Sequence, residues 1–564
     1  MSGRRGQSAI AIVAAVAVAQ CLPLWQSHWF DSHETSAYVL RLVEFESALR
    51  QGDLYPRWAS DFYGGYGSPF FVFYAPFVFA IGAAGSALLG SAILGLKSMI
   101  TLASIAAGVG VYVAVKAETQ RVDAALLAAL VYLASPYRLA DIYVRGDIAE
   151  YTALALLPWA IWGYRRIGLA LPTGGAMAPA MLAVGAHACL LFSHAILGLW
   201  GTLLLGGVCL ATTLQLVRRR SHRQVALLWA AFVLALTISS VYTGPALLQK
   251  RYVHIANATA DGYDPVNELL RFGRLLQKGQ FGILPFVGAA FGLSLVAVLL
   301  RPSDKRSMTW SVAAAACALL STRYAEPFWL LRLPLSRFIQ FPWRLHGLAA
   351  LAAALALGIA WAVIFRRGSW PEPLALLAGA AALLATAWLC AVSRPLDRGS
   401  FPETTSEIAS GMHHTTADEY LPLGVPAPPT VPCSSLVSKA PGIDVVGSFS
   451  RGSTHELDLV TRDAAQADLC LHMFPGWHVE TLQGPAAASL VTSTAGLVAL
   501  KLPSRGHYRL RVSFGTSPVR AAFAGLSLLA ALVCWPLLRW LSGSRFAPAR
   551  VDPMVSGHAL GLAG

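Results

Sequence analysis

Long apolar runs separated by short polar segments fill most of the chain between residues 10 and 393, and one more run lies near the C-terminus. A straight membrane-spanning helix needs roughly 20 apolar residues, and several runs reach that length. Backbone polar groups must find partners inside a bilayer, so such runs are expected to be helical. The pattern predicts twelve spans, at residues 10–24, 92–115, 122–137, 151–165, 176–193, 195–217, 224–247, 281–300, 308–322, 343–365, 371–393 and 519–541.

The apolar segment 69–90 is not counted among the twelve, because Pro69, Pro76 and several glycines interrupt it. Irregular backbone is tolerated at membrane depth only where protein or water surrounds it, so a re-entrant or juxtamembrane helix is expected there. The first run has an ambiguity of its own, since Ala-Val-Ala at 17–19 resembles a signal-peptidase site. Whether that run is retained or cleaved, the chain after it emerges on the outer side.

Charge placement supports the same class of protein. The 564 residues are 56% hydrophobic and 13% charged, against about 25% charged in soluble domains. Clusters of basic residues stand at the ends of apolar runs, where they hold loops in the cytoplasm, and with twelve spans every cluster falls on that side. These clusters are Arg4/Arg5, Arg165/Arg166, Arg218–Arg223, Arg301–Arg306 and Arg366/Arg367. The net charge of +14 therefore indicates membrane topology rather than nucleic-acid binding.

Residues 394–518 differ in kind from the rest. Proline and glycine become frequent, and the stretches 469–473 and 508–514 alternate between apolar and polar residues, which is typical of half-buried strands. We expect a small extracytoplasmic β-sandwich between a transmembrane domain (1–393) and a last helix with a cytoplasmic tail (519–564). Cys433 and Cys470 alone among the eight cysteines lie in polar sequence, so a disulfide between them is expected on that oxidising side.

The first external loop, residues 25–91, carries Asp31 and Glu34 just after the first span. Residues three apart share one face of a helix. A carboxylate at this level could take a proton from an acceptor hydroxyl as a phosphate leaves, and Asp31 is the first candidate for that base, with Glu34 as its neighbour or alternate. The ordinary alternative is an acidic first turn of an amphipathic helix.

The second external loop, residues 136–151, packs five charges between two apolar runs. Ionisable groups at that depth are costly and usually face one another or a wet cavity. Arg138 or Arg145 could hold a phosphate through two hydrogen bonds, and Asp147 or Glu150 could bind a sugar hydroxyl or a divalent cation. The alternative is an interfacial salt-bridge cluster.

Two further candidates lie in the apolar sequence. His194 stands between two spans expected to meet on the external side, where it either lines a site or bonds a backbone carbonyl. Arg344 opens the tenth span among aromatic residues and either pairs with a phosphate or serves as an interfacial anchor. We find no phosphate loop, dinucleotide fingerprint or HExxH motif in a usable context, so an ATP-driven pump is not expected.

Several short motifs occur together in one order. They are Asp31, Gly52–Trp58, Gly64–Phe70 ahead of Phe73–Pro76, Ser135–Arg138, Arg145-Gly146, Glu150, Ser193-His194, Phe341–Arg344, Glu419–Pro422 and Phe474–Trp477. This order resembles the bacterial integral-membrane family labelled "6-pyruvoyl-tetrahydropterin-synthase-related", a GT-C-like group close to the YfhO-like proteins. The resemblance covers nearly the whole chain, and nothing in it implies pterin chemistry.

The resemblance implies a GT-C-like glycosyltransferase in the bacterial cytoplasmic membrane, with its active site facing the periplasm. The donor would be a polyprenyl-phosphate-linked sugar and the acceptor a glycan, lipid or protein. Asp31 maps onto the acidic catalyst of the first loop, and Arg57 joins Arg138, Arg145 and Arg344 as candidates to bind the donor phosphate. Some superfamily members use Mg²⁺ or Mn²⁺ and others use no metal; this chain lacks a clean Asp-x-Asp in either loop.

Two other classes share these features. A transporter or flippase for lipid-linked sugars would use the same arginines and aromatic residues without a base. A non-catalytic partner in envelope assembly would present its β-domain to another enzyme.

Overall fold

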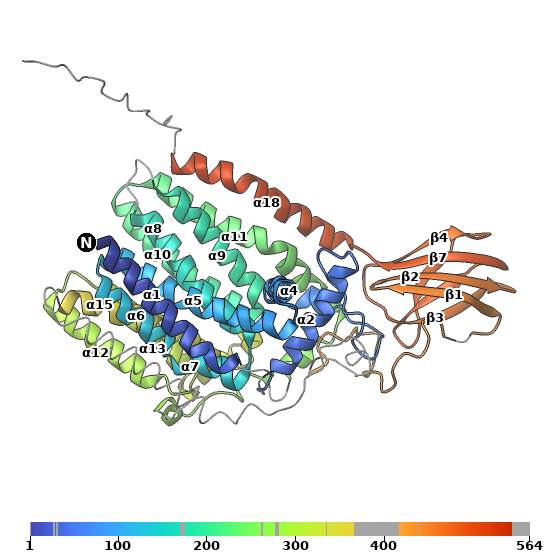
Figure 1. The fold of residues 1–564 in the computed structure, drawn as a ribbon, viewed down its shortest axis with the longest axis horizontal. Coiled ribbons are helices and arrows are strands. Elements are labelled where there is room, and N and C mark those ends of the chain that lie inside the picture. Colours follow the sequence, from blue (N-terminus) through green and yellow to red (C-terminus); the bar gives the residue numbers. More distant parts are fainter. Residues whose placement is uncertain are drawn as a thin grey trace, which may run out of the picture.

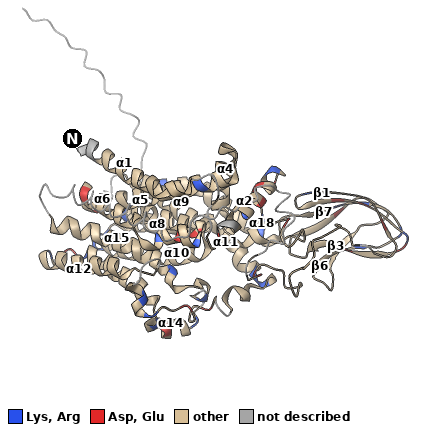
Figure 2. Cartoon of the chain, turned by 60° about the horizontal axis from the view of Figure 1, so that its bottom comes forward, with Lys and Arg blue, Asp and Glu red and all other residues tan. Residues whose placement is uncertain are grey.

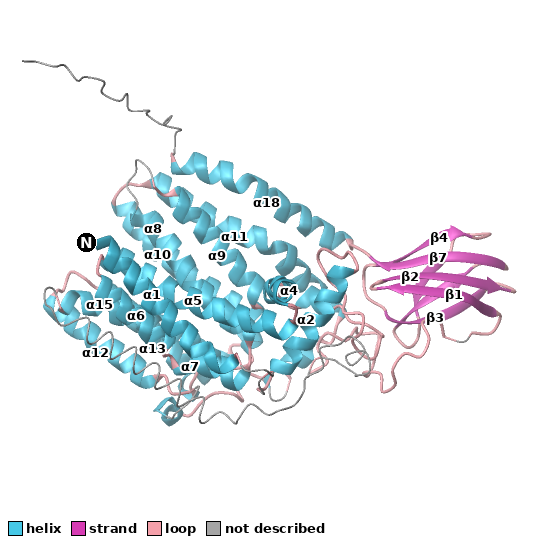
Figure 3. Cartoon of the chain, viewed as in Figure 1, coloured by secondary structure: helices cyan, strands magenta, loops and turns pink. Residues whose placement is uncertain are grey.

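The computed structural model describes residues 2–25, 29, 32–169, 175–260, 263–276, 281–333, 336–365, 415, 417–438 and 440–543. It is mostly helical, with a bundle of long helices at one end and a small group of β-strands at the other (Figures 1 and 3). Charged residues are sparse along the bundle (Figure 2). Charged side chains that could take part in catalysis or binding are therefore sought at the two ends of the bundle.

A helix covers each of eleven predicted spans. These helices are α1 (Ser2–Cys21), α5 (Ala92–Thr119), α6 (Val122–Leu133), α8 (Ile148–Leu169), α9 (Met177–Ser193), α10 (Ala195–Arg218), α11 (His222–Gln249), α12 (Leu284–Leu300), α13 (Arg306–Leu320), α15 (Leu345–Ile364) and α18 (Pro518–Ser542). The expected span 371–393 lies outside the described residues. Within the described chain, six helices are long and apolar enough to cross a membrane alone, and a seventh crossing results if α6 and residues 136–145, bent by 40°, count as one. The total of twelve stays a prediction.

Residues 69–90 form two short helices, α3 (Phe70–Phe73) and α4 (Phe77–Leu89). Thirteen residues rise only about 20 Å, less than the roughly 30 Å hydrocarbon core, so α4 is too short for a straight crossing. A Cβ at Gly95 of α5 would collide with the backbone of α4 at Gly82. Glycine at this position therefore allows the two helices to pack closely, as small residues commonly do between membrane helices.

At one end of the bundle, basic residues from different loops share a carboxylate. Glu118, at the end of α5, accepts hydrogen bonds from Arg165 Nε at 2.7 Å and from Arg306 Nη1 at 3.3 Å. At the same end Arg223 donates to the carbonyl oxygen of Leu541 at 2.8 Å, which ties the start of α11 to the end of α18. We call this the arginine-loop end.

Two antiparallel sheets make up the β-domain. The strands are β1 (Ile443–Arg451), β2 (Thr454–Thr461), β3 (Ala465–His472), β4 (Trp477–Gln483), β5 (Ser489–Thr492), β6 (Leu497–Leu502) and β7 (Gly506–Phe514). Their orders are β1-β2-β7-β4 and β3-β6-β5. Leu457 and Leu510 from one sheet share a buried core with Leu469 and Leu500 from the other, which makes a small sandwich. Alternate burial along β2 follows from the period-2 pattern of a half-buried strand.

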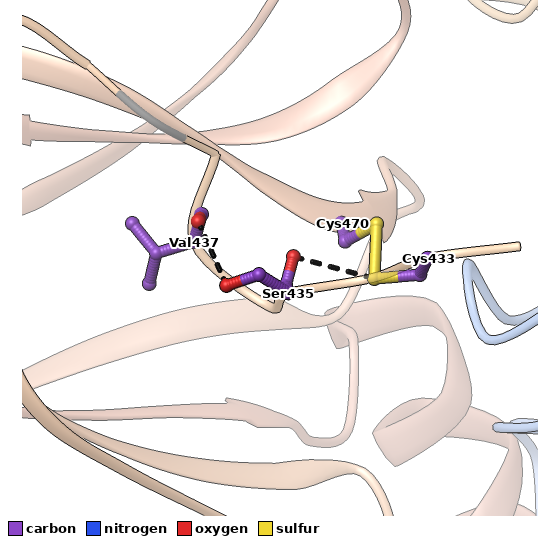
Figure 4. The surroundings of a disulfide bond; sticks show 4 residues. All are labelled: Cys433, Ser435, Val437 and Cys470. Atoms are coloured by element: carbon purple, nitrogen blue, oxygen red, sulfur yellow. Dashed lines mark hydrogen bonds between the residues drawn. A yellow bond between two sulfur atoms is a disulfide. The ribbon is translucent and has the colours of Figure 1, made fainter.

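A disulfide fastens the segment before the sandwich to strand β3, and this segment contacts the first loop. Cys433 and Cys470 are bonded, as expected, and the same segment is held by a hydrogen bond from Ser435 Oγ to the carbonyl of Val437 (Figure 4). The backbone N–H of Cys433 also donates to Gly64 O in the first loop at 2.8 Å. The short α2 (Thr35–Arg50) lies at this end of the bundle, facing the strands (Figure 1).

The first loop fits against the sandwich through Trp58. Its ring centroid lies 5.2 Å from that of Trp477 and 4.7 Å from that of Phe514. Gly67 has a φ of +74°, and a Cβ there would collide with the Trp58 indole. Glycine is therefore required by both the backbone conformation and the close approach of the ring.

Candidate functional site

The second loop forms a buried turn at the other end of the bundle from the arginine-loop end. After α7 (Pro136–Ala140) the chain makes a π-helical turn, η2 (Asp141–Arg145), and Gly146 takes a left-handed φ of +68°. This reversal lets Asp147 cap α8, because its Oδ1 accepts the backbone N–H of Glu150 at 3.0 Å. π-helical turns are rare in proteins, and those that do occur are often found at functional sites.

Arg145 organises the turn by contacting three carboxylates. It is hydrogen-bonded to Asp141, and its Nη2 lies 3.2 Å from both Asp147 Oδ2 and Glu150 Oε2. These four side chains are at most 7% exposed. Tyr137 donates to Glu150 and accepts from Arg145 at 3.0 Å. These contacts give most of the buried charged groups a partner, which offsets much of the cost of removing them from water.

Arg344 and His194 complete the group from distant parts of the sequence. Arg344, at the end of the turn η9 (Pro342–Arg344) that starts α15, places Nε 3.3 Å from Glu150 and Nη2 3.9 Å from Asp147. His194 Nε2 lies 3.7 Å from Asp147 Oδ2. We refer to Asp141, Arg145, Asp147, Glu150, His194 and Arg344 as the charge cluster.

The first loop reaches the charge cluster through its backbone and through α2. The backbone N–H of Glu34 donates to Arg145 O at 2.9 Å, and Tyr38 donates its hydroxyl to Asp147 Oδ1 at 2.9 Å. The Glu34 carboxylate lies 3.8 Å from Arg41 and remains 41% exposed. Glu34 is thus an open carboxylate at the rim of a closed cluster. Asp31 lies outside the described residues.

Local charges shift the two acids of this region in opposite directions. Burial and the nearby Asp147 raise the pKa of Glu34, although Arg41 and Arg145 oppose the rise. Burial acts to raise the pKa of Asp147 as well, but His194, Arg145 and Arg344 outweigh it and hold that pKa below its usual range. Two neighbouring carboxyls with pKa values moved apart are what separate acid and base roles require.

The other predicted phosphate-binding residues lie elsewhere. Arg57 donates to the carbonyl oxygen of Val241 on α11 at 2.9 Å, beside the sandwich rather than the charge cluster. Arg138 is 1% exposed, and its guanidinium lies 4.7 Å from the ring centroid of Tyr132 and 4.6 Å from that of Tyr151. Neither contacts the cluster carboxylates in the part of the chain that the structure describes.

The sequence reasoning missed four contributors to this region: Tyr38, Arg41, Tyr137 and Asp141. Tyr137 and Asp141 were visible as members of the dense second loop. Tyr38 and Arg41 follow Glu34 by four and seven residues and so lie on the same helical face, which could have suggested a common direction. No local signal indicates that this face packs on the second loop.

A metal ion is the cofactor that the resemblance leaves open. Asp147, Glu150 and His194 offer ligand atoms within 4.8 Å of one another. Two features oppose a metal in this arrangement. The same carboxylate oxygens contact Arg145 and Arg344.

The second feature is the proton of His194. Its Nδ1 accepts the backbone N–H of Leu197 at 3.0 Å as the N-cap of α10. Because Nδ1 accepts this hydrogen bond, the ring proton sits on Nε2, the atom that faces Asp147. A protonated Nε2 cannot ligate a metal, so the residues as arranged do not fit one.

Solved structures that resemble this chain are GT-C glycosyltransferases. The oligosaccharyltransferase of Archaeoglobus fulgidus matches with a TM-score of 0.41 and 13% identity over 75% of this chain and 61% of that one. The mycobacterial arabinofuranosyltransferase AftD matches with a TM-score of 0.38 and 18% identity over 69% and 27%. ArnT from Cupriavidus metallidurans matches with a TM-score of 0.31 and 13% identity over 63% and 77%. At these values the likenesses carry no argument about activity.

The chain spans about three fifths of the archaeal oligosaccharyltransferase that it matches. No curated protein shows a significant sequence match. The model of one family, described as a 6-pyruvoyl-tetrahydropterin synthase related domain of membrane proteins, matches residues 71–394, more than half of the chain. The chain therefore belongs to the 6-pyruvoyl-tetrahydropterin synthase related family of membrane proteins.

Proposed function

We propose that this chain is a membrane glycosyltransferase that moves a sugar from a polyprenyl-phosphate donor to an acceptor in the cell envelope, with inversion. Transfer takes place on the extracytoplasmic face of the bacterial cytoplasmic membrane. The acceptor is a glycan, a lipid or a protein.

One observation carries the proposal: both external loops, the hinge at His194 and the start of α15 converge on a single charge cluster. The basic loop residues that favour a cytoplasmic location gather at the opposite end of the bundle, around Glu118. Buried ionisable groups at the membrane edge are expensive and mark substrate paths. This separation supports an active site on the outer face.

The proposed reaction is a single displacement. An acceptor hydroxyl oxygen attacks the anomeric carbon, and the new C–O bond forms as the bond to the phosphate oxygen breaks, so the configuration inverts. The hydroxyl proton passes to a carboxylate, and polyprenyl phosphate leaves as the anion. General-base catalysis of this kind contributes about 10²–10⁴-fold to the rate.

The base is a carboxylate at the start of the first loop. Asp31 is the residue predicted from the sequence. Among the described residues, Glu34 is the open carboxylate of this loop: its side chain is 41% exposed and lies 3.8 Å from Arg41. Asp147 and Glu150 are held by arginines and are therefore poorer candidates.

The leaving phosphate needs positive charge where its own charge develops. Arg41 is the arginine that contacts Glu34, at 3.8 Å. Arg145 and Arg344 supply the positive charge of the neighbouring charge cluster. Asp147 and Glu150 fix the direction of Arg145 and Arg344, and His194 would help to shape a sugar pocket beside Asp147. No step of this scheme runs through a metal ion.

Turnover in detergent tests the proposal. Purified protein incubated with a radiolabelled polyprenyl-phosphate sugar and an envelope extract should release polyprenyl phosphate and label an acceptor. A transporter would leave the donor intact in detergent and move it across sealed vesicles. An assembly partner would do neither, and either result would reject the enzyme.

A further inference from the structure

A cavity of about 850 Å³ lies between the first loop and the sandwich, apart from the charge cluster. Its walls come from the C-terminal part of α2, residues 51–61, residues 433–436, the β1–β2 hairpin and the start of α18. A volume of this size is at the upper end of ordinary ligand sites, which enclose roughly 300–1,000 Å³.

The lining is polar and holds acidic and basic side chains in equal number. Eight serine or threonine side chains line the cavity, with three carboxylates (Glu44, Asp53 and Asp61) and three guanidinium groups (Arg57, Arg451 and Arg520). A phosphate or an acidic polymer would favour an excess of arginine, and a lipid chain would favour apolar walls. This lining instead offers donors and acceptors in mixture, and Trp58 and Phe514 add aromatic surface.

Three buried polar atoms of the lining have no hydrogen-bond partner among the described residues. They are Gln51 Oε1, Tyr55 Oη and Arg57 Nη1. One is an acceptor, one a donor, and the hydroxyl can be either. Each of these atoms is itself covered from water, so it lies beneath the cavity wall and does not face the open space.

The cavity is far from the charge cluster along α2. Glu34 bonds to Arg145 at the N-terminal end of this helix, while Ser47 and Gln51 line the cavity at the other end. Thirteen residues from Glu34 to Ser47 rise roughly 20 Å in a helix. An occupant of the cavity therefore does not contact the group that reacts at the cluster.

We infer that this cavity binds a stretch of the acceptor carbohydrate chain several sugar units away from the hydroxyl that receives the new sugar. The inference rests on the proposed function. Sugar hydroxyls donate and accept at once, which matches the mixed polar lining. Binding of remote units would hold the acceptor end in place at the cluster, so affinity should rise with chain length.

Direct binding tests the inference without requiring transfer. Full-length protein in detergent is titrated by calorimetry with oligosaccharides of graded length, released by mild acid from the envelope of the organism that encodes the chain. We expect binding that strengthens with length. Ser434→Trp and Thr516→Trp, at exposed positions of the lining, should each weaken it by at least about tenfold.

Ser489→Trp is the matched control, because Ser489 is exposed on β5 and does not line the cavity. It should leave binding unchanged. Failure of every oligosaccharide to bind, equal binding by the cavity variants and the wild type, or binding of peptides in their place would overturn the inference. Loss of donor turnover with length-dependent binding retained would reject the proposed function and leave the carbohydrate site standing.

Discussion

Both ends of the helical bundle hold arginine–carboxylate groups, but they are built differently. At the arginine-loop end, Glu118 serves two arginines, and Arg306 remains 38% exposed. At the other end, Arg145 serves three carboxylates, and no side chain among them is more than 7% exposed. Arg306 also pairs with Asp304, so arginines and carboxylates are equal in number in the first group. In the second group, Arg145 and Arg344 face three carboxylates.

This difference separates topology from chemistry. Exposed basic residues hold a loop on one side of a membrane at little cost, because water still solvates them. A fully buried cluster carries a large desolvation penalty, which good geometry only roughly offsets. Orientation in the membrane does not require such a buried group, and we therefore propose a functional role for the charge cluster.

The largest expected effect is on transfer itself. Glu34→Gln removes the open carboxylate, and if Glu34 is the base, the rate should fall by about 10²–10⁴-fold with folding retained. Asp31→Asn, measured in the same donor-turnover assay, decides which of the two carboxylates acts. Glu118→Gln, at the arginine-loop end, is the matched control and should keep full activity. Full turnover by both first-loop variants would show that neither Asp31 nor Glu34 is the base.

Removing a carboxylate from the fully buried cluster should destabilise more than removing one from the partly open arginine-loop end. Glu150→Gln leaves Arg145 and Arg344 short of a carboxylate and should lower the free energy of unfolding by about 3–5 kcal/mol. Glu118→Gln should lower it by about 1 kcal/mol. Denaturation of both variants in detergent checks the ranking. Equal losses would mean that the two ends do not differ in kind.

Part of the fold and part of the charge cluster could be predicted from the sequence. The apolar runs predicted helices at eleven spans because helical backbone is the ordinary solution in lipid, and the dense second loop predicted that Arg145, Asp147 and Glu150 belong together. Segment 69–90 was predicted not to cross, and its helices are short.

The pairing itself could not be predicted from the sequence. Arg344 reaches Glu150 across almost 200 positions, and Tyr38 meets Asp147 only because α2 packs on the second loop. Arg57 was grouped with the cluster because of its motif, yet it lies beside α11 and the sandwich. Short motifs identify residues, whereas tertiary packing decides which of them meet.

A moderate effect concerns the role of His194. If its ring caps α10 and donates through Nε2, then His194→Asn should retain stability, because the amide oxygen can accept the same N–H. His194→Ala should lose about 1 kcal/mol. Thermal unfolding of the pair checks this, and equal loss in Asn and Ala would argue against capping.

A smaller effect is expected from pH at the first loop. Burial and the nearby Asp61 raise the pKa of Glu44 to about 8, from an ordinary 4.5. The folded state therefore holds this proton more tightly, so the stabilisation is complete below the unfolded pKa and is lost as pH rises toward about 8. Melting temperature should fall over that window, and Glu44→Gln should flatten the fall.

Asp463→Asn, at an exposed position of the sandwich, is the control for this profile and should follow the wild type. A wild-type profile that rises with pH would contradict the sign.

The smallest expected effect is that of removing metal. Because arginines contact the carboxylate oxygens and His194 presents a protonated Nε2, chelation with EDTA should leave donor turnover unchanged. Loss of turnover that Mn²⁺ or Mg²⁺ restores would show that the cluster rearranges around a cation.

A structure of the protein in lipid nanodiscs with bound polyprenyl phosphate would show directly whether the donor phosphate binds beside the charge cluster. We expect phosphate density next to Glu34 and Arg41, between the first and second loops and on the side of the charge cluster. Phosphate bound at the arginine-loop end, beside Arg165 and Arg306, would contradict this expectation.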